Sequence, residues 1–508
     1  MAVMDVRPST PLPLPVLDRT GNLLVRVRRS VRTVLYLLRT VGLGLLWTAI
    51  SLFSDSNFFT GKSLVDQNGP EFLSTTMVWN QIMFCGFSIA TQSAFLTKQR
   101  FIDRPDRPAG YLLCLRRVFK ATFVVNTFTS VFPIGVVFAL NAAASSSSSC
   151  VLRWSFYICS FASLVFTASL TIAVRRIFLE TSIAGTERQK KKIFESLSVI
   201  PRREGQWKRQ SRQFCRVLFQ TSPGTLSSLF AAGYVQATST NLPTSQRDLA
   251  IFAVCSIGLK LFDQELIKLV TMKRKITDIR TMFLVVAVPT VLIDTQVRIM
   301  LQLANSVVTT VGGSVLMAFV EIGMRTGKMH YLRWKIHRKT RRAYAPILVT
   351  PSRVASMITI HPVLETGNPL SETRRQREES VRNFETWKMQ LLRFHAAEAY
   401  ADMAAEYMAL ASSAMIVAVY ADHPKYELRQ WRFETSTSNS TDSSRYIILL
   451  ELQLAIELVV DTVSCVVETA NGVNFDELKK YESFLMALFV VIGVMDVQIT
   501  AIMYLQCE

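Results

Sequence analysis

The sequence predicts an all-α protein, a polytopic transmembrane helix bundle of about nine to eleven spans with a cytoplasmic N-terminus. Half of its 508 residues are hydrophobic, and the mean hydropathy is +0.26. The apolar residues gather in blocks of about twenty, the length that crosses a bilayer as one helix. Basic residues lie between the blocks, as in membrane proteins. A soluble chain of this length is usually less apolar and divides into two or three domains.

Eleven apolar blocks are the predicted spans. They cover about 34–54, 77–97, 121–140, 154–174, 217–236, 248–271, 281–303, 305–324, 396–420, 446–470 and 483–505. The fifth is interrupted by Ser222-Pro223-Gly224, and the sixth carries Lys260, Asp263, Glu265 and Lys268. Leaving both out gives nine spans with the same alternation.

The distribution of basic residues sets the orientation. With the N-terminus inside, the cytoplasmic segments hold 46 Lys and Arg residues and the exoplasmic segments hold 7. This excess follows the positive-inside rule and places the C-terminus outside. The only Asn-x-Ser/Thr tripeptide begins at Asn439, in the predicted exoplasmic loop 421–445, and is a candidate glycosylation site.

Four regions follow from this pattern. Residues 1–33 form a Pro-rich and basic cytoplasmic tail, and 34–324 a first transmembrane bundle of about eight spans. Residues 325–393 form a basic cytoplasmic segment that is partly helical, and 394–508 a second bundle of about three spans. A helix is expected from Ser371 directly into the ninth span. The first span is interpreted as a signal anchor, which favours a plasma-membrane or endomembrane location over a mitochondrial one.

The net charge of +19 raises the question of nucleic acid. Because the basic residues follow the loops between spans, we expect no nucleic-acid partner. Two clusters are instead interpreted as contacts to the lipid bilayer through anionic lipid headgroups. They are Lys190, Lys191 and Lys192 in one loop, and Arg338, Lys339, Arg341 and Arg342 in the segment 325–393.

The tenth span is the most unusual, because acidic residues interrupt its apolar sequence. At about 100° per residue, Gln453, Glu457, Asp461, Ser464 and Glu468 share one narrow face. Glu451 lies off this stripe, nearer the exoplasmic end. Lipid offers a carboxylate no partner, so the stripe is expected to face protein or water.

Candidate partners for these acids are few. The predicted spans contain only Arg39, Lys260, Lys268 and Arg298 as bases, and acids outnumber them. The four acids of the tenth span together with Asp263, Glu265, Asp294, Glu321, Glu406 and Asp496 already make ten. Asp294 and Arg298 are four residues apart, a spacing at which they can pair with each other. Pro289 is expected to interrupt their helix. The acidic excess favours a cation or proton over an anion as any permeant species.

No motif indicates an enzyme. The chain lacks a Gly-rich phosphate loop, GxSxG and HExxH, so we expect neither catalysis nor a cofactor. One run offers metal-ligating residue types at three- and four-residue spacing: His395, Glu398, Asp402 and Glu406. The run begins at the cytoplasmic end of a span, where a charged side chain stays near water and costs little free energy. We therefore expect no metal there. Ala401, Ala405, Ala409 and Ser413 on the same helix predict a close packing face.

The leading functional hypothesis is a secondary transporter or channel for a cation or a proton-coupled solute. Its candidate transport residues are Glu451, Glu457, Asp461, Glu468, Asp294 and Arg298. The alternative is a receptor-like or scaffold membrane protein that does not transport and acts through its basic cytoplasmic segments.

Overall fold

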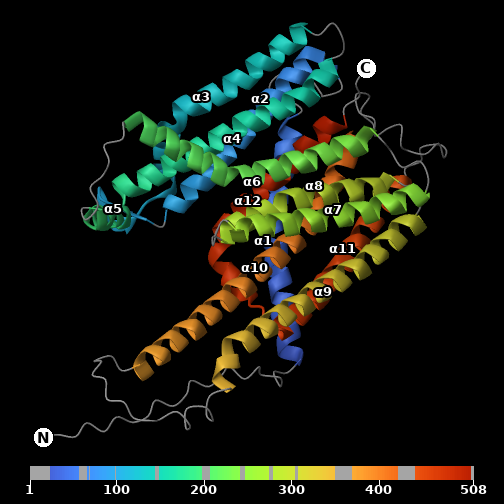
Figure 1. Cartoon of the computed structure of the whole chain (residues 1–508). Coiled ribbons are helices and arrows are strands. Elements are labelled where there is room, and N and C mark those ends of the chain that lie inside the picture. Colours follow the sequence, from blue (N-terminus) through green and yellow to red (C-terminus); the bar gives the residue numbers. More distant parts are fainter. Residues whose placement is uncertain are drawn as a thin grey trace, which may run out of the picture.

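The computed structural model describes most of the chain. The described residues are 23–55, 66–67, 69–97, 99–143, 148–196, 206–240, 246–273, 279–303, 307–348, 369–420 and 441–504. Within these residues the fold is all-α, as predicted, with one small β-hairpin (Figure 1).

Each of the eleven predicted blocks lies within one long α-helix, apart from at most two residues at an end, and several of the helices extend well beyond their blocks. These helices are α1 (Leu23–Asp55), α2 (Gly69–Leu96), α3 (Tyr111–Ala143), α4 (Ser148–Thr181), α6 (Gln206–Thr240), α7 (Gln246–Lys273), α8 (Ile279–Leu303), α9 (Val307–Leu348), α10 (Pro369–Tyr420), α11 (Thr441–Ala470) and α12 (Glu482–Met503). The predicted continuous helix into the ninth span is confirmed as α10.

Four short elements were not predicted. They are the antiparallel strands β1 (Arg100–Phe101) and β2 (Arg104–Pro108), the helix α5 (Ile183–Ser196) and the 3₁₀ helix η3 (Phe475–Tyr481). The hairpin joins the end of α4, because Phe101 forms a β-bridge with Ser182. This contact links two segments that the sequence places on the cytoplasmic side.

Among the described residues, six helices are long and apolar enough to cross a membrane. Their spans are Leu24–Ile50, Tyr111–Leu140, Tyr157–Thr181, Met282–Gln302, Glu379–Tyr420 and Phe475–Thr500. Helices α7 and α11 are as long but carry more charged residues. The structure shows why these two helices tolerate the charges, as described below.

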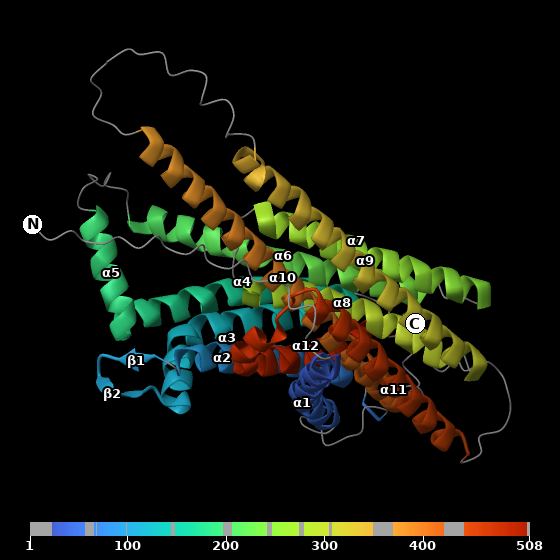
Figure 2. The same ribbon diagram turned by 90° about the horizontal axis from the view of Figure 1, so that it is seen from below.

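Helices α8 and α10 form the centre of the bundle. They pack along each other, and α1, α6, α7, α9, α11 and α12 surround them (Figures 1 and 2). The small-residue face of α10 is confirmed, since Ala401, Ala405, Ala409 and Ser413 are all fully buried. Helices α2, α3 and α4 form a second group with its own apolar core, around Cys114 and Phe166.

The outer surface is strongly apolar. On α3, Val124, Phe128 and Val131 are more than 60% exposed, which a water-soluble surface would rarely present so contiguously. Helix α11 is arranged with its polar face inward. Ile448 and Val459 are each 62% exposed, whereas Asp461 on the same helix is 0% exposed. This arrangement suits a hydrocarbon solvent.

The end of α11 turns sharply into η3. Gly472 has φ of 90°, a left-handed conformation that a residue without Cβ adopts at low cost. The amide of Val473 then donates to the carbonyl of Glu468, and the Asn474 side chain caps η3. The turn brings Glu477 to Arg393 of α10 at 2.7 Å and Asp476 to Arg29 of α1 at 3.9 Å.

Helices α9 and α10 extend beyond the rest of the bundle at this same end (Figures 1 and 2). Helix α9 has 42 residues and α10 has 52, far more than a bilayer requires. The two extensions approach each other, and Lys339 of α9 lies over the ring of Trp387 of α10.

Candidate functional site

The polar stripe of α11 faces the centre of the bundle. Gln453, Glu457, Asp461, Ser464 and Glu468 are between 0% and 7% exposed, which confirms the predicted inward face. Glu451, off the stripe, is exposed and lies outside this site. The charged side chains that meet the stripe come from α8, α9 and α10 and form a buried network.

Each acid of the stripe has a basic or imidazole neighbour. Arg298 of α8 donates to Glu457 and forms an ion pair with it. Asp461 lies 3.0 Å from a guanidinium nitrogen of Arg325 on α9. At the end of the stripe, Glu468 lies 3.5 Å from Nε2 of His395 on α10. The polar stripe of α11 is therefore covered by side chains of the neighbouring helices.

The predicted pairing of Asp294 with Arg298 along α8 is wrong. Asp294 instead accepts a hydrogen bond from the Lys260 ammonium of α7 at 2.8 Å. Since Arg298 pairs with Glu457 on α11, the two residues of α8 reach different neighbouring helices. Helix α8 is also continuous through Pro289, so the interruption expected at that residue is absent.

A second basic residue of α9 completes the network. Lys328 lies 3.1 Å from Glu398 and 3.9 Å from Asp402, both on α10. It also donates to the Gln264 side chain at 2.8 Å, and Gln264 donates to Asp402 at 2.6 Å. This hydrogen bonding joins α7, α9 and α10.

The acids of α10 therefore lie in the interior. The sequence placed the start of this run at the end of a span, where a charged side chain costs little, but the structure buries all four members. His395, Glu398, Asp402 and Glu406 are each less than 10% exposed. They are buried because α10 is the central helix, and Lys260, Arg325 and Lys328 supply compensating charge.

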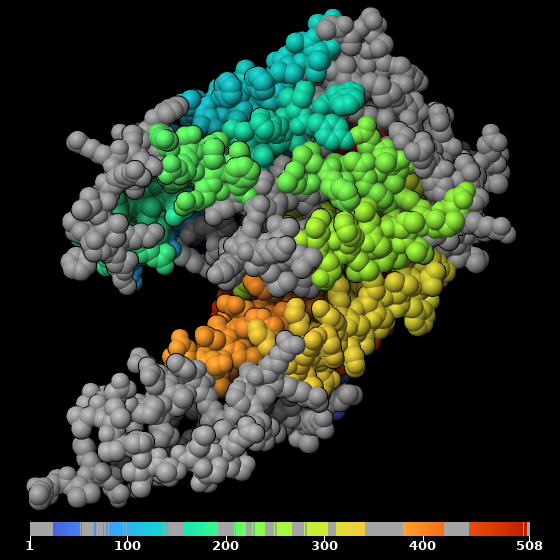
Figure 3. All heavy atoms as spheres, in the orientation of Figure 1, coloured from blue at the N-terminus to red at the C-terminus, as the bar shows by residue number. Residues whose placement is uncertain are grey.

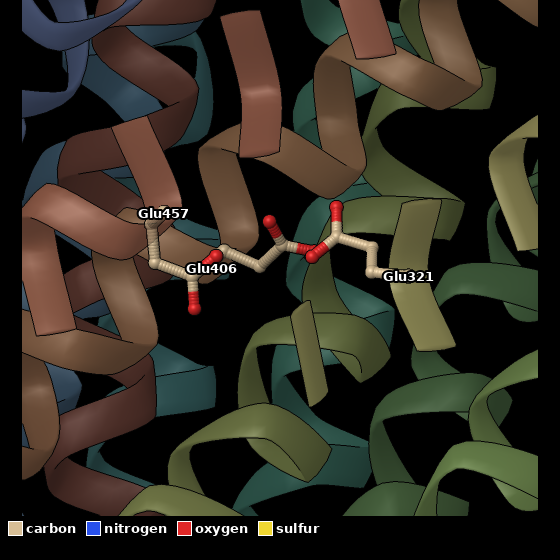
Figure 4. A group of neighbouring side chains, drawn as sticks. All are labelled: Glu321, Glu406 and Glu457. Carbon is tan, nitrogen blue, oxygen red and sulfur yellow. The ribbon is translucent and has the colours of Figure 1, made fainter. Parts of the chain in front are cut away.

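Three carboxylates from three helices meet at the middle of the network. One carboxylate oxygen from each of Glu321 (α9), Glu406 (α10) and Glu457 (α11) lies within 4.8 Å of the other two. Figure 4 shows Glu406 between its two neighbours. Carboxylates are the ligands of hard cations. Basic side chains also reach the cluster, because Arg325 lies 2.6 Å from Glu321 and Arg298 pairs with Glu457.

Glu406 differs from the other acids in how it is compensated. Its two basic neighbours, Lys260 and Arg325, are each 3.6 Å away, and both lie closer to another acid. Its side chain is 5% exposed. Glu406 therefore shares both of its basic neighbours with other acids.

Sequence reasoning missed Arg325, Lys328 and the central place of Glu406. The predicted span ended at residue 324, which assigned both bases to the cytoplasmic segment. In the structure α9 continues through that boundary, and Arg325 is 5% exposed. One signal was available: Arg325 follows Glu321 by four residues, the spacing of an ion pair on one helix face.

The basic clusters predicted to touch lipid headgroups are only partly described. Lys190 is exposed on α5, and Arg338 and Lys339 are exposed on α9. The side chains of Lys191, Lys192, Arg341 and Arg342 lie outside the described set. Asn439 also lies outside it. Arg39 is exposed on α1, and the Lys268 side chain is not described.

A further polar contact joins α8 to α12. Thr295 donates to Asp496 at 2.8 Å, and Gln296 accepts from the Tyr504 hydroxyl at 2.5 Å. These hydrogen bonds satisfy part of the polar surface that the apolar helix α12 brings into the interior.

Comparisons with known proteins give no relationship. No family model, curated protein or solved structure matches this chain. Function must therefore be argued from the geometry of the buried charge network.

Proposed function

We propose that this chain is a multi-pass membrane transporter or channel for a cation or a proton-coupled solute, and that the buried charge network is its ion site. The observation that carries the proposal is an excess of acid in the interior. Four basic side chains, Lys260, Arg298, Arg325 and Lys328, contact seven carboxylates within 4.0 Å among the described residues.

An excess of buried carboxylate needs a further positive charge. A buried ion costs several kcal/mol unless it is paired and hydrogen-bonded, and ionised carboxylates that share a small site repel one another. The repulsion is relieved by a bound cation or by a proton. A site whose charge balance depends on one exchangeable ion has the chemistry that transport requires.

Glu406 is the residue we assign to the exchangeable ion. It lies between Glu321 and Glu457 and shares both of its basic neighbours with other acids. Glu457, Asp461 and Asp294 each have a basic residue within 3.0 Å or in direct hydrogen-bonding contact, which favours a role in holding the network together.

The proposed topology has nine to eleven spans with a cytoplasmic N-terminus. It is supported by contacts between segments that the charge distribution assigns to one side. Arg29 approaches Asp476, Arg393 pairs with Glu477, and Phe101 bridges to Ser182. Lys260 and Asp263 of α7 are buried, as are Glu457, Asp461 and Glu468 of α11, and this inward placement supports counting both helices among the spans.

The test is ion flux through the reconstituted full chain. Proteoliposomes carrying a pH-sensitive dye are given a K⁺ diffusion potential, and proton entry is followed. Parallel experiments impose a Na⁺ or a K⁺ gradient and follow the flux of that ion instead of proton entry. We expect Glu406→Gln to reduce flux at least tenfold, and Glu451→Gln, on the exposed face of α11, to leave it unchanged. Flux unaffected by Glu406→Gln would remove the assignment of the exchangeable ion to Glu406.

A second function has a specific observation in its favour. Helices α9 and α10 extend beyond the charge network on the proposed cytoplasmic side, which transport alone does not require. A receptor-like or scaffold protein would use such a projection to bind partners. Deletion of residues 343–370 separates the two functions: loss of cellular function with intact membrane insertion and intact flux favours the receptor or scaffold.

A further inference from the structure

The extensions of α9 and α10 line an open cavity of about 760 Å³. Its lining consists of basic, aromatic and small polar side chains: Tyr331, Trp334, Lys335, Arg338 and Lys339 from α9, and Ser380, Asn383, Phe384 and Trp387 from α10. No carboxylate is part of this lining. In Figure 3 the side chains of the two helices meet in the lower part of the molecule, where yellow and orange adjoin.

The basic groups of the cavity lie against aromatic rings. The Lys339 ammonium is 3.8 Å from the centre of the Trp387 ring, and the Arg338 guanidinium is 5.3 Å from that of Trp334. Within the described part of the chain, neither base has a carboxylate within 4.0 Å. The nearby acid Glu385 lies outside the lining and contacts Lys388 at 3.6 Å.

The polar atoms of the cavity favour an anion. The three basic side chains and the two indole N–H groups can only donate hydrogen bonds, and Ser380 and Asn383 can donate as well. A phosphate group accepts such bonds and supplies the missing negative charge. The exposed rings of Tyr331 and Trp334, 58% and 53% exposed, offer apolar surface beside the anion site.

The position of the cavity along α9 and α10 indicates which anion. Helix α11 ends at Ala470, and Arg393 of α10 pairs with Glu477 just beyond that end. Trp387 precedes Arg393 by six residues, about 9 Å along a helix. This places the cavity at the depth of the lipid headgroups on the proposed cytoplasmic side, where aromatic and basic residues gather.

We propose that this cavity binds the headgroup of an anionic phospholipid from the cytoplasmic leaflet. Arg338 and Lys339 hold the phosphate, and Tyr331 and Trp334 contact the glycerol and the start of the acyl chains. The proposal uses the topology above but is independent of transport, since lipid binding is measured without any ion gradient.

The test is binding of soluble lipid to the purified full chain in detergent, followed by thermophoresis. The probes are dioctanoyl phosphatidylinositol 4,5-bisphosphate, dioctanoyl phosphatidylcholine, and inositol trisphosphate as a headgroup without acyl chains. We expect the first probe to bind most tightly. A basic residue near a lipid surface contributes about 1 kcal/mol, about fivefold in affinity, so Arg338→Gln with Lys339→Gln is expected to weaken binding about 25-fold.

Two further variants keep the test specific. Lys190→Gln removes an exposed basic residue of α5, on the same proposed side, and is expected to leave affinity unchanged. Asn383→Asp places a carboxylate in the exposed lining and is expected to weaken binding without altering folding. Equal losses for Lys190→Gln and the cavity pair would indicate diffuse charge attraction and overturn the proposal. Inositol trisphosphate binding as tightly as the lipid would assign the cavity to a soluble ligand instead.

Discussion

Replacing either of two neighbouring glutamates of the charge network by glutamine is expected to have different effects on stability. Glu457→Gln removes the carboxylate that pairs with Arg298, and the two side chains are 9% and 11% exposed. Breaking a buried pair by removing one partner costs about 3–5 kcal/mol, because the remaining charge is left uncompensated. Glu406→Gln removes a carboxylate whose basic neighbours are both closer to other acids, and so leaves no base without a partner.

The difference is large enough to measure as a melting temperature. At the average unfolding entropy of about 2.1 cal/mol/K per residue, ~4 kcal/mol corresponds to ~4 °C for a chain of 508 residues. We therefore expect Glu457→Gln to lower Tm by about 4 °C. We expect Glu406→Gln to change it by less than about 1 °C, or to raise it.

The assay is intrinsic tryptophan fluorescence during heating of the detergent-purified chain. A double variant, Arg298→Gln with Glu457→Gln, serves as the control, since it removes both charges. It should recover most of the Tm lost by Glu457→Gln. Arg298 and Glu457 are not a coupled pair if the double variant loses the sum of both single effects on Tm. Glu406 does not differ from Glu457 if Glu406→Gln lowers Tm as much as Glu457→Gln does.

Three further predictions concern packing, the boundary of the bundle and topology. A Cβ on Gly493 of α12 would lie 2.4 Å from the Thr48 hydroxyl of α1, so Gly493→Ala should cost about 1–3 kcal/mol. Gly42→Ala, where nothing lies within 4 Å, is its control, and equal Tm values would contradict the close approach. Lys328→Gln loses its contacts to Glu398, Asp402 and Gln264 and should lower Tm, whereas Arg333→Gln on an exposed position of α9 should not. In cells, the wild-type chain should lose mass on treatment with an N-glycosidase, and the Asn439→Gln variant should not. If an acceptor site introduced into a proposed cytoplasmic loop is glycosylated instead, the orientation of the chain is the opposite of the one proposed.

The helices were predictable because their signals are local. The eleven long helices, which are α1 to α12 except α5, each contain a block of about twenty apolar residues and are separated by charged loops. The arc of polar residues on α11 follows from helical periodicity alone. The length of α9 was not predictable to the same degree. Its apolar block ends near Glu321. The four-residue spacing from Glu321 is a local signal for Arg325, but no such signal indicates that Lys328 remains inside the bundle.

The partners within the network were not predictable, because they depend on which helices pack together. Asp294 and Arg298 have an ideal spacing for each other, yet Lys260 and Glu457 compete for them from neighbouring helices. The role of Glu406 has the same origin. In the sequence it belongs to a run that resembles a charged helix end, and only the central position of α10 places it between Glu321 and Glu457.

The most direct measurement of the central claim is ion flux through the Glu406→Gln variant. The variant and the wild-type chain are reconstituted at equal density, after their Tm values are shown to agree, and proton, Na⁺ and K⁺ flux are compared. We predict that the wild-type chain conducts or exchanges one of these ions and that Glu406→Gln reduces that flux at least tenfold without loss of stability. Wild-type flux that persists unchanged in the folded variant would contradict the assignment of Glu406 as the ion site.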